Sequence, residues 1–339
     1  MKILVTGGLG YIGSHVVVEL QEKGYEVIII DNLSNTSIDV LDNITSITGI
    51  RPTFEKIDIR YKEELHAFFK RHNSIEGIIH FAASKAVGES VNSPLLYYEN
   101  NVNALVYLLQ NIQNNDISLI FSSSCTVYGQ AEQLPVTENA PIKPAESPYG
   151  NTKQIGEEII RDTCKVKPNL KAIALRYFNP IGAHQSAKIG ELPIGVPQNL
   201  VPYITQTAIG LRKQLSVYGN DYPTRDGTAI RDYIHVADLA KAHVAALSRL
   251  LNRKAKENFE IFNVGTGTGS TVMEVITAFE KASGVSLNYR IVDRRAGDVV
   301  EAYAQTDKAR NILGWTPTYS LEESLASSWK WEKIVREKK

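Results

Sequence analysis

Short apolar runs alternate with longer amphipathic stretches through the first half of the chain. Short continuous apolar runs are typical of buried parallel strands, whereas apolar residues repeating every three or four positions are typical of helices. This alternation predicts an α/β fold with a doubly wound parallel sheet. Strands are expected at 2–6, 26–30, 53–57, 77–81, 119–124, 171–177 and 259–264, and helices at 11–23, 61–71, 94–114 and 148–165.

The regular alternation ends near residue 180. Turn-rich segments at 190–197 and 219–227 take its place. We therefore expect a first domain over 1–180, to which the strand near 259–264 returns. A smaller C-terminal α/β lobe would occupy mainly 181–339.

The turn after the first predicted strand is rich in glycine. Gly7, Gly10 and Gly13 have the spacing Gly-x-x-Gly-x-x-Gly, between a strand and a helix. Such a unit opens the Rossmann dinucleotide fold, in which backbone N–H groups and the helix N-terminus face a pyrophosphate. Asp31 ends the second strand, where a carboxylate accepts from both ribose hydroxyls and repels a 2′-phosphate. A purely structural glycine turn is the alternative, but Asp31 favours an NAD site.

A tyrosine and a lysine are expected on one face of the helix that begins near residue 148. Ser147 followed by Pro148 is a good helix start, and Tyr149 and Lys153 are four residues apart. A fixed cation can bring the pKa of a phenol, ordinarily about 10, toward neutral pH. This spacing is common on helix surfaces. It gains weight from Ser122–Ser124, which end a predicted strand at the sheet edge where ligands bind.

Composition is that of a compact soluble protein. The 339 residues are 43% apolar and 22% charged, enough for a large core and two lobes. The 37 basic and 37 acidic residues balance, so neither a nucleic-acid partner nor a cationic membrane face is expected. No signal peptide and no apolar run of roughly 20 residues is seen. Cys125 and Cys164 lack metal-ligand spacing, so we expect a cytoplasmic protein without a metal.

Several collinear motifs resemble one known group of enzymes. Together with the glycine turn, those at 122–129 (Ser-Ser-Ser-x-x-Val-Tyr-Gly), 147–153, 176–179 and 231–236 resemble the extended short-chain dehydrogenases/reductases. The segments at 80–81, 85–90, 219–224 and 294–298 are, more narrowly, similar to the UDP-glucose 4-epimerases. The resemblance covers essentially the whole chain. One departure is Cys125, where the family often has alanine.

The resemblance implies roles for the matching residues. Besides the three glycines, the NAD-binding positions would be Tyr11, Ile12, Asp31, Asn32, Asp58, Ile59, Phe81, Ala82, Lys85, Asn100, Ser122, Tyr149, Lys153 and Phe178. The UDP-sugar positions would be Ser124, Tyr149, Asn179, Asn199, Leu200, Ser216, Tyr218, Arg231, Arg295, Asp298 and Ala302. Tyr149 would be the catalytic base at the sugar 4-hydroxyl, with Lys153 stabilising its phenolate and Ser124 relaying the proton.

Some of these residues have simpler explanations. A planar guanidinium can bond two phosphate oxygens at once, which suits Arg231 and Arg295 to a diphosphate. The alternative is an ordinary surface ion pair with Asp232 or Asp298, which lie near in sequence. Tyr218 would stack on uracil, or it merely covers the turn that begins at Gly219.

The implied activity is the interconversion of UDP-glucose and UDP-galactose, as in galactose metabolism, and three alternatives remain. A sugar-nucleotide 4,6-dehydratase would need its acid–base pair at Cys125 and Thr126. A 4-epimerase for UDP-N-acetylglucosamine and UDP-N-acetylgalactosamine, or for UDP-uronic acids, would differ only in its pocket lining. A non-catalytic NAD sensor would have no need of Ser124, Tyr149 and Lys153 together.

Ala302 is the position that lies beside the sugar in the family. A small residue there leaves room for an N-acetyl group at the sugar 2-position. Two circumstances would remove this room: neighbouring side chains could fill it, or a shift of one residue would put Tyr303 at the wall instead.

The predicted helices at 94–114 and 148–165 carry apolar residues on more than one face. A single face of a sheet could not cover all of them. The resemblance implies a homodimer in which these helices form a four-helix bundle across a two-fold axis. The apolar residues are Leu95, Leu96, Val102, Leu105, Leu108, Ile155, Ile159 and Ile160.

Overall fold

Seven parallel strands form the main sheet of the structure, a computed structural model that describes residues 1–112, 116–295 and 298–337. They lie in the order β10-β6-β5-β4-β1-β2-β3. Every strand predicted from the apolar runs is present, which confirms the α/β class and the doubly wound sheet. The strands are β1 (Lys2–Thr6), β2 (Glu26–Asp31), β3 (Thr53–Lys56), β4 (Gly77–His80), β5 (Ile117–Ser124), β6 (Leu170–Tyr177) and β10 (Phe259–Val264).

Helices cover both faces of this sheet. Ile3 and Val5 of β1 pack toward one group of helices, and Leu4 between them packs on the opposite face with Leu105. Burial on both faces explains why the strands read as continuous apolar runs. The helices of this lobe are α1 (Tyr11–Glu22), α2 (Asp39–Thr48), α3 (Lys62–Arg71), α4 (Val87–Asn92), α5 (Pro94–Tyr97), α6 (Ala104–Asn111), α7 (Pro148–Val166) and α9 (Val236–Leu251).

The helix predicted at 94–114 is interrupted by a wider turn. Residues Tyr98–Asn103 form a π-helix, η1, between α5 and α6, and the predicted end at Asn114 lies outside the described residues. Asn101 in this turn donates to the carbonyl of Ser84 and to Thr152 Oγ1, both at 3.0 Å, and accepts from the Ser84 N–H. These bonds satisfy the buried amide of Asn101, which would otherwise be costly in the core.

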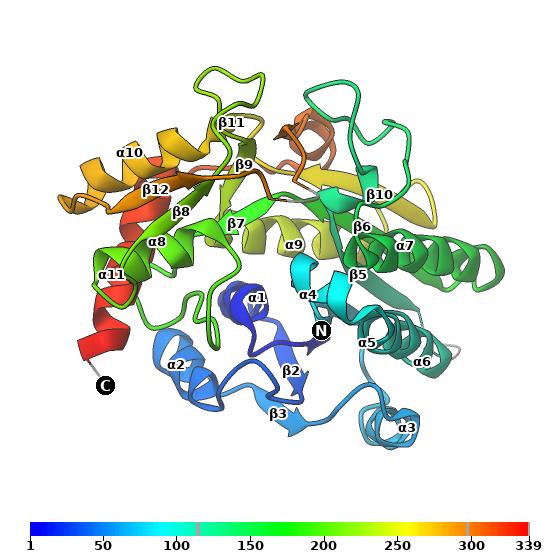
Figure 1. Ribbon diagram of the computed structural model, residues 1–339. Helices are drawn as coiled ribbons and strands as arrows, with labels where there is room; N and C mark the ends of the chain where they lie inside the picture. Colours follow the sequence, from blue (N-terminus) through cyan, green and yellow to red (C-terminus); the bar gives the residue numbers. More distant parts are fainter. Residues whose placement is uncertain (113–115, 296–297, 338–339) are drawn as a thin grey trace.

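A second, smaller lobe follows β6 (Figure 1). Strand β9 pairs with β7, β11 and β13, and β8 pairs with β12. Helices α8, α10 and α11 pack around an apolar core that includes Ile204, Phe279 and Leu325. The elements are β7 (Asn179–Ile181), β8 (Leu215–Tyr218), β9 (Ile230–His235), β11 (Gly269–Thr271), β12 (Tyr289–Val292), β13 (Glu301–Ala302), α8 (Leu200–Ala208), α10 (Val272–Ser283) and α11 (Leu321–Glu337).

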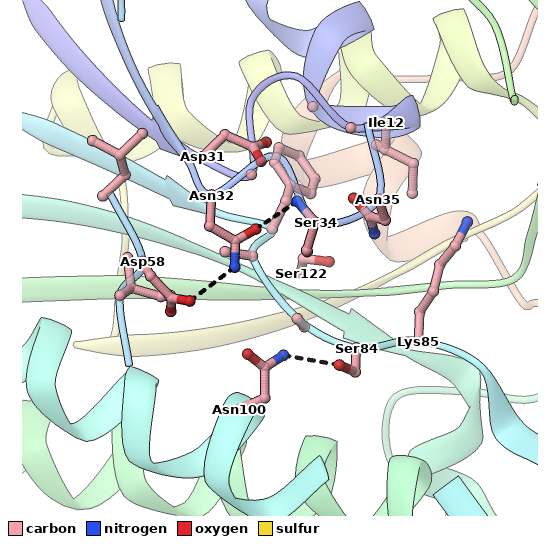
Figure 2. Close-up of a pocket in the computed structure, with 18 of the residues that line it drawn as sticks. Ile12, Asp31, Asn32, Ser34, Asn35, Asp58, Ser84, Lys85, Asn100 and Ser122 are labelled. Atoms are coloured by element: carbon pink, nitrogen blue, oxygen red, sulfur yellow. Dashed lines mark hydrogen bonds between the residues drawn. The ribbon is translucent and has the colours of Figure 1, made fainter. Parts of the chain in front are cut away.

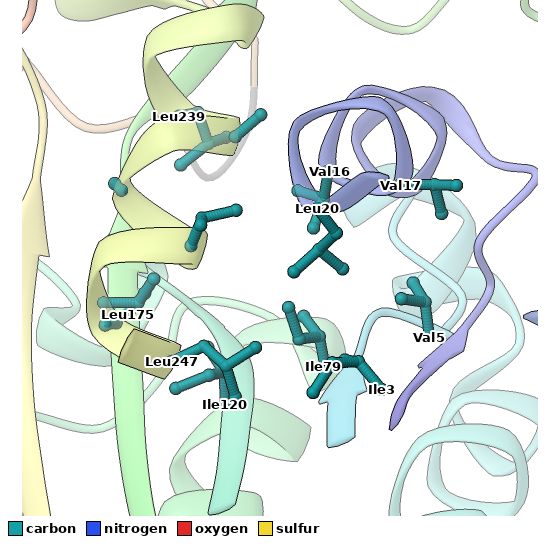
Figure 3. Close-up of a cluster of buried hydrophobic side chains, with 14 of the residues drawn as sticks. Ile3, Val5, Val16, Val17, Leu20, Ile79, Ile120, Leu175, Leu239 and Leu247 are labelled. Carbon is teal, nitrogen blue, oxygen red and sulfur yellow. The ribbon is translucent and has the colours of Figure 1, made fainter. Parts of the chain in front are cut away.

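Helix α9 packs in the first lobe although it lies late in the chain. Figure 3 shows Leu239 and Leu247 of α9 facing Val16 and Leu20 of α1 across the core. The chain therefore returns to the first lobe with a helix as well as with β10. The part of the chain from α9 to β10 separates the two sequence segments that build the second lobe.

The apolar residues of the two long helices are divided between the core and the surface, and Val102, Ile155 and Ile159 are only partly buried. Leu105, Leu108 and Ile160 are fully buried against the sheet. Their spacing follows the ordinary core-facing stripe of a helix. Leu95 and Leu96 do face solvent, with 81% and 39% of their surface exposed. None of the described helices is both long and apolar enough to span a bilayer.

Candidate active site

A cavity of about 330 Å³ opens at the carboxyl edge of the main sheet. Strand β1 pairs with β2 on one side and with β4 on the other, so the strand order reverses at this point. Ligands of doubly wound sheets bind at such a reversal. The predicted NAD-binding residues that line it are Gly7, Gly10, Tyr11, Ile12, Gly13, Asp31, Asn32, Asp58, Ile59, Phe81, Ala82, Lys85, Asn100, Ser122, Tyr149 and Lys153. Phe178 instead packs in a small cluster with Val127 and Tyr128.

The glycine turn shapes the floor of the cavity. Gly7 has φ +68°, and a Cβ there would lie 2.8 Å from the backbone nitrogen of Ala82. A Cβ on Gly13 would lie 2.3 Å from the carbonyl oxygen of Gly7. Gly10 precedes α1 without a side-chain cap, which leaves backbone donors of the first turn for a ligand. The turn therefore fits the pyrophosphate of a dinucleotide.

Acidic and amide groups gather at the end of β2. Asp31 is buried and accepts from the backbone N–H groups of Leu9 and Leu33, at 3.2 and 2.9 Å. Burial raises the pKa of this carboxyl, and the backbone hydrogen bonds oppose the rise. Asn32 donates to Asp58 at 3.1 Å, as Figure 2 shows. The arrangement offers acceptors for ribose hydroxyls beside an amide.

Further lining residues were not predicted from sequence. They are Ile30, Ser34, Asn35, Ile57, Arg60, Ala83, Ser84, Leu96 and Tyr177. Arg60 makes an ion pair with Asp58 at 2.6 Å, which holds the pKa of that carboxyl below its usual value. Their position in the chain could have indicated that they line the cavity, because most of them lie at or shortly after the carboxyl ends of strands β2, β3 and β4.

Lys85 and Tyr11 connect the cavity wall to the second lobe, whereas Asn100 bonds within the wall. Asn100 donates to Ser84 Oγ at 3.0 Å (Figure 2). Lys85 makes an ion pair at 3.1 Å with Glu191, which belongs to the second lobe. Tyr11 also reaches this lobe, since its hydroxyl donates to the carbonyl of Gly182 at 2.6 Å. The cofactor wall is thus tied to the second lobe at two places.

Tyr149 and Lys153 project from the first turns of α7 into the cavity. The helix begins as predicted, because Ser147 Oγ accepts from the N–H of Gly150 at 3.2 Å. Tyr149 is 8% exposed and Lys153 4%. The Lys153 ammonium donates to the carbonyl of Ser122 at 2.7 Å. The predicted pair is therefore buried at the end of β5, on one helix face.

The pKa of Tyr149 differs from the expectation based on its spacing. Burial raises it well above the usual value of a phenol, and the adjacent Ser124 hydroxyl only opposes that rise. Burial also lowers the pKa of Lys153 to about 8. The Lys153 nitrogen is directed at Ser122 and lies 5.8 Å from the Tyr149 ring centroid. The protein alone therefore does not bring this tyrosine toward neutral pH, and a further positive charge is required.

Tyr177 is a second tyrosine in the cavity wall. Its hydroxyl and Ser122 Oγ form a hydrogen bond of 2.5 Å, and burial raises its pKa to about 12. Tyr177 pairs in register with Ser124 across β5 and β6. The sequence placed it at a strand end, but only this register brings it next to the serines.

Comparisons with known proteins agree with the geometry. Residues 4–327 match the protein family described as GDP-mannose 4,6 dehydratase. The UDP-glucose 4-epimerase of Bacillus subtilis is 49% identical over 333 residues, which cover 98% of this chain and 97% of that protein. The chain belongs to the UDP-glucose 4-epimerase family.

Solved structures of this family superpose on the whole chain. The epimerase of Stenotrophomonas maltophila with bound NAD and formylated UDP-arabinopyranose is 44% identical, with a TM-score of 0.95 and 100% coverage of both chains. The epimerase of Bifidobacterium longum in complex with NAD+ and UDP is also 44% identical, with a TM-score of 0.93 and 98% coverage of both chains. The resemblance drawn from the motifs is confirmed.

Arg231 and Asp298 are close together in the second lobe of this family member. Arg231 Nη2 lies 3.6 Å from Asp298 Oδ1, and Nη1 donates to the carbonyl of Ile230. Asp232 does not pair with Arg231, because it is buried and accepts from Thr266, Gly267 and Ala304. The ion pair with Asp298 is partly buried, unlike the exposed pair considered from sequence.

The other predicted sugar-nucleotide residues are spread along the second lobe. None of the described ones lines the cavity above, apart from Tyr149. Asn179 begins β7, Asn199 and Leu200 begin α8, Ser216 and Tyr218 lie on β8, and Arg295 is exposed after β12. Ser124, at the end of β5, stands between the cavity and this lobe. Asn199 donates to Glu191, the partner of Lys85, at 2.9 Å.

Ala302 ends β13, and Tyr303 follows it with different neighbours. Ala302 packs with the cluster that contains Phe178 and Cys125, next to Ser124. The Tyr303 ring lies against Gly269, where an added Cβ would come within 3.0 Å of it. Ala302 and Tyr303 therefore have different neighbours, and only Ala302 shares a cluster with Cys125, the residue that follows Ser124.

The acid–base pair of a dehydratase is not available at its expected positions. Cys125 and Thr126 begin the short helix η2 (Cys125–Tyr128) and carry no carboxyl group. Burial raises the pKa of the Cys125 thiol to about 11, so it stays protonated near neutral pH. These two residues cannot supply the acid and base that loss of water from a sugar requires.

Proposed function

We propose that this protein interconverts UDP-glucose and UDP-galactose with NAD as a bound cofactor. The observation that carries the proposal is the buried pair of Tyr149 and Lys153, beside Ser124, in a cavity shaped for a dinucleotide. NAD would accept hydride from C4 of the sugar and return it to the opposite face. The glycine turn would hold its pyrophosphate and Asp31 its ribose.

The chain's own residues then handle the proton. Tyr149 removes it from the sugar 4-hydroxyl and later gives it back. Lys153 and the positive nicotinamide ring together offset the cost of a buried phenolate. Ser124 hydrogen-bonds the same sugar oxygen and relays the proton. Arg231, Arg295 and the wall around Tyr218 would anchor UDP, so that the oxidised sugar can turn over without leaving.

A second substrate pair is supported by Ala302. Ala302 packs with the cluster that contains Cys125, the residue after Ser124, and in the proposed complex a larger side chain here would narrow the space beside the sugar. We therefore include UDP-N-acetylglucosamine and UDP-N-acetylgalactosamine as slower substrates. UDP-glucose and UDP-galactose remain the main pair, and their interconversion in the cytoplasm serves galactose metabolism.

We also propose a homodimer. Val91 of α4 and Leu95 of α5 are 59% and 81% exposed, beside α7. Two copies of α5–α6 and α7 would cover these side chains in a four-helix bundle.

The direct test of function is conversion of UDP-galactose by purified protein with no NAD added. Formation of UDP-glucose at catalytic rates is expected. A 4-keto-6-deoxy sugar would identify a dehydratase instead. Bound NAD without any turnover would identify a sensor, and would refute the proposed reaction.

A further inference from the structure

We propose that Glu157 is a positioning residue for the reaction, which keeps the proton of the Tyr149–Lys153 pair on the lysine. The inference rests on the proposed function, because it assigns Glu157 a part in the same acid–base step. Glu157 itself does not line the cavity and would touch neither substrate nor cofactor.

Helix α7 brings the three groups into line. Tyr149, Lys153 and Glu157 are each four residues apart, on one helix face. All are buried, and Glu157 is 3% exposed. Glu157 is thus one helical turn from Lys153 and two turns from Tyr149. Its neighbour Glu158 is exposed, as expected for the opposite face.

Three hydrogen bonds from two residues hold the Glu157 carboxylate in place. Arg176 Nε and Nη2 donate to its two oxygens, at 2.9 and 2.5 Å. Ser123 Oγ donates to it at 2.6 Å. Ser123 lies between Ser122, whose carbonyl accepts from Lys153, and Ser124. The carboxylate therefore holds the end of β5, where Ser122 bonds Lys153 and Ser124 bonds Tyr149.

The charges around Lys153 leave Glu157 as its counter-charge. From β4, His80 faces the lysine, but burial lowers its pKa to about 3 and keeps it neutral. From β6, Tyr177 is also neutral near pH 7. Tyr149 on α7 starts as a neutral phenol. Among the described residues, Glu157 is the negative group that opposes the fall in the pKa of Lys153 caused by burial, and the positive Arg176 paired with it offsets part of its charge.

Position along the helix decides which group keeps the proton. Tyr149 and Lys153 form a coupled pair, so a single proton lost from it can come from either group. A negative charge nearer the lysine favours ammonium with phenolate over amine with phenol. Only the state with ammonium and phenolate contains the phenolate that acts as the base. Folding stability alone does not explain why a Glu157–Arg176 ion pair is buried here, because apolar residues of similar size can often replace such a pair without loss of stability.

The test is the pH dependence of kcat/KM for UDP-galactose, from pH 6 to 10, with holoenzyme. Loss of a negative charge makes both protons of the pair easier to remove. In Glu157→Gln, the acidic and the basic limb of the kcat/KM profile should both move to lower pH by about one unit, and the maximum value of kcat/KM should fall. Glu157→Asp, which keeps the carboxylate, should restore the limbs. Glu158→Gln is the matched control and should behave like wild type.

Each outcome separates this inference from the proposed function. Wild type without epimerase activity would refute the function. An active wild type with a Gln variant that is slower but keeps the wild-type limbs would assign Glu157 a purely structural role and overturn the inference. If Glu157→Gln does not fold, Glu157→Gln/Arg176→Gln leaves no unpaired charge, and its limbs should move in the same direction by a smaller amount. Bound NAD and UDP affinity should stay at wild-type levels in every folded variant.

Discussion

Burial governs the chemistry of single residues in this site. A phenol and an ammonium group that are both buried favour their neutral forms. Tyr149 and Lys153 show this, since burial raises the pKa of the first and lowers that of the second. A bound NAD would supply a positive nicotinamide ring that favours the phenolate. Free acid–base activity without a cofactor is therefore not expected.

Replacement of Tyr149 tests the base directly. Tyr149→Phe removes one oxygen and should lower kcat by at least about two orders of magnitude, the scale of general acid–base catalysis. Binding of NAD and UDP should remain, because the ring is kept. The measurement is steady-state turnover of UDP-galactose together with calorimetric titration by UDP. Tyr107→Phe, on α6 outside the cavity, is the control, and near-normal turnover in Tyr149→Phe would exclude Tyr149 as the base.

Replacement of Ala302 tests the sugar pocket. Ala302→Tyr should abolish conversion of the N-acetylated pair, since a phenol would occupy the space beside the 2-substituent, and should leave UDP-galactose conversion within about threefold of wild type. Both pairs are assayed on both proteins. Tyr303→Ala, at the next position, should not change the ratio of the two activities. A wild type inactive on N-acetylated sugars would contradict the idea.

At the scale of elements, the strands of the main sheet and four helical segments of the first lobe could be predicted, whereas α2, α4, α9 and the elements of the second lobe were not. Apolar runs buried on both faces are distinctive, and so are the glycines between β1 and α1. Helix α2 buries only Leu41 and Ile44, and α4 has six residues including Gly88, so each offers few buried positions to a reading of the sequence. The π-turn in η1 depends on bonds that Asn101 makes to distant segments. Tertiary contacts of this kind leave no periodic signal.

The proposed catalytic residues could be named from the sequence because each stands at a strand or helix end with a motif around it. Tyr177 and Arg60 were missed, since their place in the wall depends on which strands are neighbours. Strand order and register are products of packing over the whole sheet. Sequence alone therefore predicts the cofactor wall better than it predicts contacts between walls.

Asn101 provides the element-scale prediction. Its side chain is 6% exposed and joins η1 to Ser84 after β4 and to Thr152 on α7. Asn101→Leu would leave these groups unpaired, at a cost of about 1–3 kcal/mol each. The melting temperature should drop by several degrees, and NAD retention should weaken because Ser84 and Asn100 line the cavity. Differential scanning calorimetry measures the first effect. Asn103→Leu, at an exposed position of the same turn, should change neither quantity.

At the scale of the whole molecule, the proposed homodimer can be tested by placing a charge in its interface. Leu95→Glu places a charge on a side chain that is 81% exposed in one chain but covered in the proposed dimer. Light scattering at micromolar concentration should give a dimer for wild type and a monomer for Leu95→Glu. Leu211→Glu, at a 55% exposed leucine of the second lobe, should remain dimeric. A monomeric wild type would count against the bundle.

The two ties across the lobes have a consequence for exchange of the cofactor. The bond from the Tyr11 hydroxyl to Gly182 and the ion pair between Lys85 and Glu191 both connect residues of the cavity wall to the second lobe. We expect release of the dinucleotide to break both contacts. We expect its residence time to follow rare separation of the lobes and to exceed the time of one catalytic turnover many times over. Each molecule would then keep the dinucleotide that it acquired as it folded, and its rate would be insensitive to swings in the cellular supply.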